Sequence, residues 1–153
     1  MRYISNYILQ KVSDLKKELK PIVESNVIWF GNEVACGLGM QKIDILTLNQ
    51  NAGRREYGII ELKDEPIQPD VVDQIEYYVN WASQNSGRHL EGRLAGIYNL
   101  FIIVGPPHDS RSRRETIEAF KNYNQKKLSP PIRYFEFEIY CGRSIVFNEV
   151  NYD

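Results

Sequence analysis

Three charged residues interrupt two short runs of Ile and Leu near the middle of the chain. Asp44 lies in the run KIDILTL, and Glu61 and Lys63 lie in the run YGIIELK. Runs rich in β-branched residues predict strands that are at least half buried. A charge in such a strand loses hydration, so it needs a partner, a metal ion or a catalytic role to offset that cost. We therefore expect the chemistry of the protein in this segment.

The two runs predict an antiparallel hairpin with strands at 43–48 and 57–63. A polar turn that contains the sequence NAG separates them, and such a turn is typical of a hairpin connection. Side chains alternate between the two faces of a strand. Glu61 and Lys63 should therefore project together from one face, whereas Leu62 points to the other.

Hydrophobic periodicity predicts the remaining elements. These are helices at 3–19, 70–83 and 112–124, a strand at 26–30, a buried and parallel strand at 97–104, and strands at 133–140 and 144–147. Gly31, Gly37 and Gly39 predict a turn-rich connection after the first strand. This order indicates an α/β fold, with a mixed central sheet flanked by helices, in one domain over residues 1–153.

Composition gives no indication of a special class of protein. The chain has 153 residues, a net charge of −1 and 25% charged residues, so binding to a polyanion would have to depend on local patches.

We find no apolar run long enough to span a membrane and no leader-like start, and we expect a cytoplasmic protein. Cys36 and Cys141 should be free thiols, and they form no metal-binding motif with the two histidines, His89 and His108.

Two carboxylates and a lysine on neighbouring strands suit metal-assisted hydrolysis of phosphodiesters. Carboxylate oxygens are preferred ligands of Mg²⁺ and Mn²⁺. A bound cation lowers the pKa of a coordinated water and offsets charge that develops on the phosphate. A nearby lysine can orient or help deprotonate that water.

The same residues resemble the PD-(D/E)xK, or restriction-endonuclease-like, nuclease superfamily. The resemblance consists of Asp44 in the sequence IDIL, sixteen intervening residues over 45–60, and then Glu61-Leu62-Lys63. Gln74 and Tyr78 in the helix that follows look like the Q-xxx-Y element of RecB-type and archaeal mismatch-nuclease-type members. The order of elements is also similar to the core of that family.

The resemblance implies a Mg²⁺- or Mn²⁺-dependent deoxyribonuclease, either an endonuclease or an exonuclease. Asp44 and Glu61 would bind the metal ion, Lys63 would act on the attacking water, and Gln74 would order the site or contact DNA. DNA is the expected partner, whether branched, mismatched or single-stranded, and RNA stays open. A homodimer or a protein partner is compatible with this. The alternatives are a nucleic-acid- or protein-binding module without catalysis and a Holliday-junction resolvase.

Some family members complete the site with an upstream acidic residue, and the sequence leaves its identity open. Asp14, Glu18, Glu24 and Glu33 all compete for that role. Each of them is also readily explained as a solvated surface charge. The proline that often precedes the first aspartate in this family is replaced by Ile43.

Candidate contacts to nucleic acid lie farther along the chain. Arg111, Arg113 and Arg114 lie at a predicted junction between a loop and a helix, where guanidinium groups and helix N-terminal amides can bind phosphates. The alternative is a solvated loop. Tyr78 could stack on a base, although aromatic residues at helical spacing more often pack in the core. A weaker basic patch is expected at Arg88, His89 and Arg93.

Overall fold

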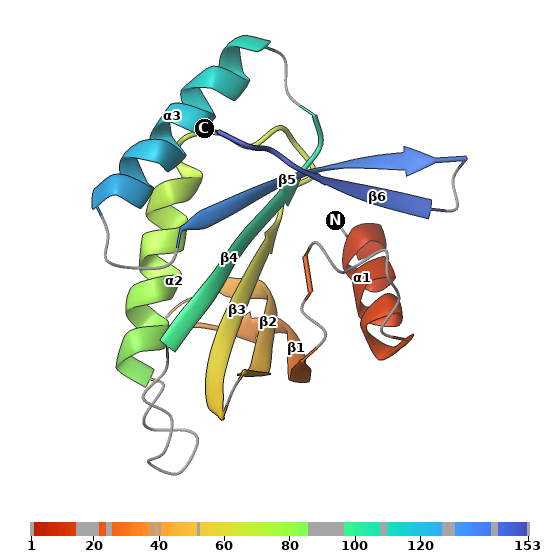
Figure 1. Ribbon diagram of the computed structural model, residues 1–153, viewed down its shortest axis with the longest axis vertical. Coiled ribbons are helices and arrows are strands. Elements are labelled where there is room, and N and C mark those ends of the chain that lie inside the picture. The colour runs from red at the N-terminus through yellow and green to blue at the C-terminus, as the bar shows by residue number, and fades with distance from the viewer. Residues whose placement is uncertain are drawn as a thin grey trace.

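The computed structural model describes residues 2–14, 22–23, 26–37, 39, 41–51, 53–85, 97–107, 110–126, 131–141 and 144–152. It is an α/β structure in which the described residues form a six-stranded mixed sheet and three helices (Figure 1). In chain order, the elements are α1 (Arg2–Asp14), β1 (Val27–Ala35), β2 (Lys42–Asn51), β3 (Arg54–Leu62), α2 (Val71–Asn85), β4 (Ile97–Gly105), α3 (Ser110–Lys126), β5 (Ile132–Tyr140) and β6 (Ser144–Glu149).

The strands lie in the sheet in their sequence order, β1 to β6. The first three strands are antiparallel, β3, β4 and β5 are parallel, and β6 returns antiparallel to β5. A parallel pair needs a crossover connection, and α2 and α3 lie in the two crossovers. The carboxyl ends of β3, β4 and β5 therefore lie at one edge of the sheet.

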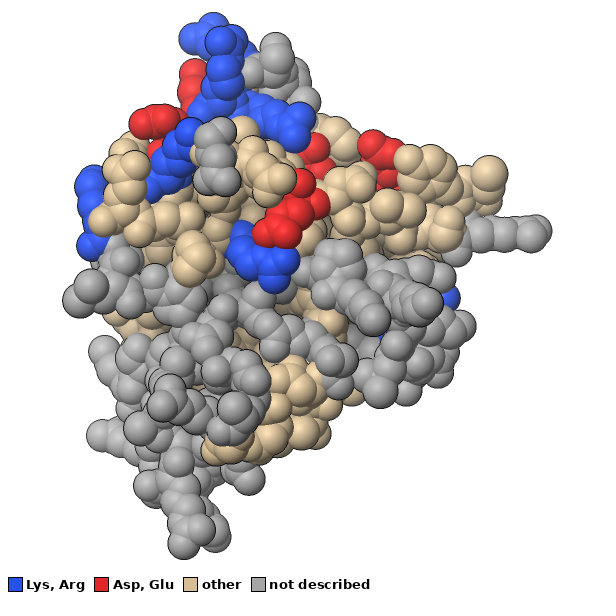
Figure 2. Space-filling view, viewed as in Figure 1, with Lys and Arg blue, Asp and Glu red and all other residues tan. Residues whose placement is uncertain are grey.

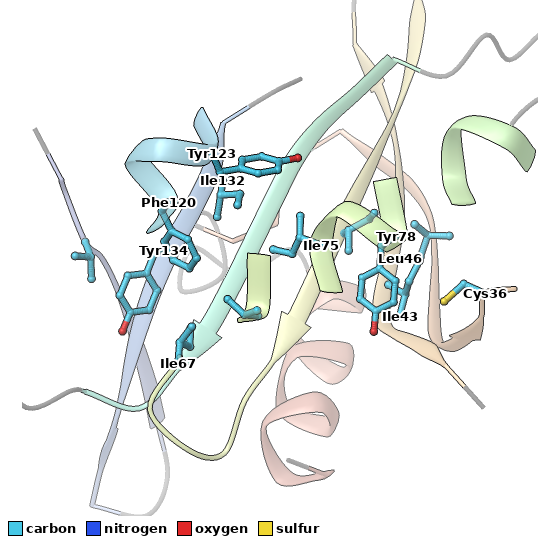
Figure 3. Packing of buried hydrophobic residues seen from close by; sticks show 13 residues of the cluster. Cys36, Ile43, Leu46, Ile67, Ile75, Tyr78, Phe120, Tyr123, Ile132 and Tyr134 are labelled. Carbon is cyan, nitrogen blue, oxygen red and sulfur yellow. The ribbon is translucent and has the colours of Figure 1, made fainter. Parts of the chain in front are cut away.

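Each face of the sheet has its own hydrophobic core. On one face, Ile4, Tyr7 and Ile8 of α1 join a cluster that contains Ile60 and Leu62. On the other face, α2 and α3 cover the cluster shown in Figure 3, to which Ile75 of α2 and Phe120 of α3 contribute, among others. The two faces seen in Figure 1 thus match the alternation that the sequence predicts for β3.

The predicted hairpin, the helices and the parallel strand β4 are confirmed, with shifts at their ends. The first helix is described as far as Asp14, and the rest of its predicted range lies outside the described residues. The prediction of a turn at Gly31 is wrong, because β1 continues through it to Ala35. A Cβ atom on Gly31 would lie 2.7 Å from Cη2 of Trp29 and 2.8 Å from Cγ2 of Val34. The glycine thus leaves room for two neighbouring side chains within the strand.

Candidate metal and catalytic site

The hairpin of β2 and β3 changes its pairing at Asp44. Backbone pairing between the two strands is regular from Asn51 and Arg54 to Ile45 and Ile60. Beyond that point, the backbone N–H of Leu62 donates to Oδ2 of Asp44 at 2.8 Å. The carboxylate thus takes a hydrogen bond that a backbone carbonyl accepts in a regular ladder, which fixes Asp44 beside the carboxyl end of β3.

Glu61 is held at this edge by two side chains. Its Oε1 accepts hydrogen bonds from Nζ of Lys63 at 2.9 Å and from Nε2 of Gln74 at 2.7 Å. Its Oε2 is buried and has no hydrogen-bond partner within the described structure. Glu61 is only 4% exposed, and an unsatisfied charged oxygen in such a position is costly. One oxygen of Glu61 is thus satisfied by the protein, and the other has no partner among the described residues.

The pKa values of both carboxyl groups are raised. Burial, followed by the negative charge of Asp44, raises the pKa of Glu61 to about 7, although Lys63 and Gln74 act in the opposite direction. Burial also raises the pKa of Asp44, against the hydrogen bond from Leu62 and the charge of Lys63. Two close carboxylates with raised pKa values are typical of a site that binds a cation or transfers protons.

A hydrogen-bonded chain from α2 holds the site together. Oε1 of Gln74 accepts from Nζ of Lys63 at 2.7 Å, and its Nε2 also donates to the Tyr78 hydroxyl at 2.6 Å. That hydroxyl donates to the backbone carbonyl of Lys42 at 2.8 Å. The expected one-turn spacing of Gln74 and Tyr78 therefore connects α2 to the start of β2. Tyr78 is 2% exposed, so its hydroxyl rather than its ring face takes part in the site.

Among the described upstream carboxylates, Glu33 lies beside Asp44 in the sheet register. The pairing of Asn32 with Ile45 and of Val34 with Ile43 brings Glu33 alongside Asp44, and its charge contributes to the raised pKa of Asp44. Glu33 has a φ of 50°, which a residue other than glycine rarely adopts. Its Oε2 is 3.0 Å from Nζ of Lys42.

The other upstream candidates are less well placed or are not described. Oγ of Ser5, near the start of α1, donates to Oδ1 of Asn32. Asp14 is nine residues farther on, about 14 Å along the helix axis from Ser5. Glu18 and Glu24 lie outside the described residues. Among the residues that the structure describes, no group of three or more His, Cys, Asp and Glu side chains is arranged to hold a metal ion.

The three arginines lie in the first turn and a half of α3, which follows the carboxyl end of β4. Arg111 forms an exposed ion pair with Glu115 at 3.5 Å, and Arg113 lies 3.3 Å from Glu136. Arg114 is exposed. Figure 2 shows Lys and Arg side chains over this side of the molecule, with acidic side chains among them. The second basic patch, at Arg88, His89 and Arg93, lies outside the described residues, as does His108.

Glu136 is a polar residue that the sequence analysis did not single out. It is 7% exposed, accepts a hydrogen bond from the Tyr134 hydroxyl at 3.0 Å and pairs with Arg113. Its charge contributes, after burial, to a raised pKa of Tyr134. The alternation in RYFEFEIY places Glu136 on the same face as Tyr134, and that signal could have identified it.

Comparison with known proteins finds no matching family model, and neither a curated protein nor a solved structure that is significantly similar. No described helix is long and apolar enough to cross a membrane. The two cysteines are free, with Cys36 buried and Cys141 exposed, as the sequence predicts. Because these comparisons find no similar protein, a functional argument depends on the geometry of the site itself.

Proposed function

We propose that the protein is a divalent-metal-dependent nuclease that hydrolyses phosphodiester bonds in DNA. The observation that carries the proposal is the unsatisfied Oε2 of Glu61, buried beside Asp44 at the edge where β3 ends. A cation between the two carboxyl groups would satisfy that oxygen and remove their mutual repulsion.

The donors at the site fit Mg²⁺ or Mn²⁺. Asp44 and Glu61 supply only oxygen ligands, which hard cations prefer. Mg²⁺ commonly keeps several waters and uses one or two carboxylates, so a site with two protein ligands is sufficient. When bound, such a cation would lower the pKa of a coordinated water and offset charge on the phosphate.

Lys63 and Gln74, which contact Glu61, are placed to position the reacting groups. Glu61 and Gln74 hold Lys63 at 2.9 and 2.7 Å, so its ammonium group lies beside the two carboxylates that would bind the metal. In that position it can hold the attacking water. Gln74 connects Lys63, Glu61 and Tyr78. We expect it to fix the orientation of both charged side chains.

A restriction-endonuclease-like core is part of the same proposal. The support is an antiparallel hairpin that carries Asp44 and the Glu61-Leu62-Lys63 triplet, followed by a helix and a strand parallel to β3. Gln74 and Tyr78 of that helix reach the site through the hydrogen bonds described above.

The arginines of α3 are our candidate phosphate contacts. The first turn of α3 contains no acidic residue and begins with Ser110-Arg111-Ser112-Arg113. Positive side chains at a helix N-terminus oppose the macrodipole, at a cost of about 0.3–1 kcal/mol each. Binding of an anion would offset that cost. Arg111 is paired with Glu115 and Arg113 with Glu136, so a bound phosphate would compete with these carboxylates.

Cleavage assays with two pairs of variants test this function. Asp44→Asn and Lys63→Ala should abolish Mg²⁺- or Mn²⁺-dependent cleavage, whereas Asp73→Asn and Lys121→Ala, which change residues outside the site, should cut at the wild-type rate. The substrates are linear duplex, single-stranded, mismatched and four-way-junction DNA, together with single-stranded RNA. Full activity of Lys63→Ala would reject its role. Calorimetric Mn²⁺ binding that is unchanged in Asp44→Asn would reject the metal site and favour a module without catalysis.

A further inference from the structure

A cavity of about 340 Å³, which is open to solvent, lies beside the candidate site, between the end of β3 and the start of α2. Lys63 and Gln74, which both contact Glu61, form part of its wall. The remainder is formed by the connecting loop and the first residue of α2. A group bound in this cavity would therefore lie next to a phosphate held at the carboxylates.

The loop around the cavity is fixed by packing and hydrogen bonds. Ile67 is 1% exposed, and its backbone carbonyl accepts a hydrogen bond from the buried Thr116 hydroxyl at 2.8 Å. A Cβ atom on Gly105 would lie 2.7 Å from Cγ1 of Ile67, so the end of β4 packs closely against the loop. The cavity is thus formed before a ligand binds, which reduces the entropic cost of binding.

The charges around the cavity disfavour the binding of a phosphate. Asp64, Glu65 and Asp70 lie on its lining, and Lys63 is the one basic residue among the lining residues. Carboxylates repel a phosphodiester and accept hydrogen bonds from amino groups. Ile67 and Val71 add apolar surface to the same lining. A group with N–H donors and an apolar surface fits these features better than a phosphate or a sulfate.

We propose that this cavity binds the unpaired base of a nucleotide adjacent to the scissile phosphate, and that it prefers bases with an exocyclic amino group. The inference rests on the proposed nuclease function and names its substrate class. A base in a duplex cannot enter such a cavity without leaving the stack. Asp and Glu accept hydrogen bonds from the amino group of cytosine, whereas thymine has no amino group and its single N3–H lies between two carbonyl oxygens. The substrate is therefore single-stranded or locally unpaired nucleic acid.

An NMR titration with nucleosides tests the base site without requiring cleavage. Backbone amide signals of the five non-proline residues in 64–70 and the side-chain amide of Gln74 are followed as 2′-deoxycytidine or thymidine is added. We expect 2′-deoxycytidine to shift these signals with an affinity at least threefold higher than that of thymidine. The double variant Asp64→Asn, Asp70→Asn should lose that preference, whereas Glu118→Gln, an exposed change on α3, should retain it.

Each outcome of this experiment decides the proposal. Equal effects of the two nucleosides, or no effect of either, would overturn it. If Mg²⁺ shifts the amides of Asp64 and Asp70, and the double variant abolishes that shift without changing nucleoside binding, the cavity is a cation site and the proposal fails. Base preference in the titration together with no cleavage of any substrate would reject the nuclease function while leaving the base site in place.

Discussion

Replacement of Glu61 by glutamine should stabilise the metal-free protein above neutral pH. Burial and Asp44 raise the pKa of Glu61 from its ordinary 4.5 to about 7, so the folded state resists ionisation of this carboxyl group. In Glu61→Gln, the side-chain carbonyl oxygen can still accept from Lys63 and Gln74, and the unsatisfied negative charge is gone. Glu61, which we propose as a metal ligand, is thus predicted to lower the stability of the metal-free protein.

The sign and size of the effect follow from proton linkage. Below the unfolded pKa of 4.5, the carboxyl group is protonated in both states and adds no penalty. As the pH rises from 4.5 to about 7, the unfolded state releases its proton first, so stability falls over this window. One pKa unit corresponds to 1.36 kcal/mol, and the penalty above pH 7 is therefore about 3 kcal/mol. Asp44, whose pKa is also raised, contributes in the same direction.

Thermal unfolding followed by circular dichroism in the presence of EDTA measures this penalty. Between about pH 5 and about pH 8, the wild type should lose about 2–3 kcal/mol through Glu61, which corresponds to a fall in Tm of about 4–12 °C. Glu61→Gln should lose much less over the same interval and exceed the wild type at the higher pH. Glu118→Gln should follow the wild type within about 0.5 kcal/mol. A Glu61→Gln variant that is less stable than the wild type at about pH 8 would refute the reasoning.

Three further changes test the packing and the connections of the site. Phe120→Ala, at a fully buried position, should lower the free energy of unfolding by about 3–5 kcal/mol, as measured in urea; a loss below 1 kcal/mol would contradict its place in the core. Gly105→Ala should lower the free energy of unfolding by about 1–3 kcal/mol, because its Cβ would lie 2.7 Å from a side-chain atom of the buried Ile67. In Gly53→Ala, no atom lies within 4 Å of the new Cβ but φ is positive, so this variant measures backbone strain without a steric clash. Tyr78→Phe removes the hydrogen bond to the carbonyl of Lys42 and should lower the free energy of unfolding by about 1–3 kcal/mol. It should also weaken Mn²⁺ binding measured by calorimetry. Unchanged Mn²⁺ affinity would limit Tyr78 to a purely structural role.

Local sequence patterns predict the parts of the fold that depend on periodicity. The alternation in residues 57–63 predicts that Glu61 and Leu62 point to opposite faces, and this is confirmed: Glu61 contacts Gln74 of α2, and Leu62 packs in the cluster with α1. The β-branched run at 97–104 identifies the parallel strand. The spacing of Gln74 and Tyr78 places both residues on one side of α2, where they contact each other.

Features that depend on contacts between distant segments are not visible in the sequence. The hydrogen bond from Leu62 to Asp44 exists because the β2–β3 ladder stops at one point, and no residue pattern encodes that point. The pairing of Arg113 with Glu136 joins a helix to a strand. β1 continues through Gly31, where the Trp29 ring lies close to the glycine, and single-residue turn preferences do not predict this course.

The most direct test of the proposed site is anomalous diffraction from a crystal of the protein soaked in Mn²⁺. We predict an anomalous peak that contacts the carboxylate of Asp44 and Oε2 of Glu61, with Lys63 and Gln74 still bound to Oε1. Such a peak would also show whether Glu33 leaves Lys42 to join the site. A protein saturated with Mn²⁺ that shows no peak between Asp44 and Glu61, and in which Oε2 stays without a partner, would contradict the central claim.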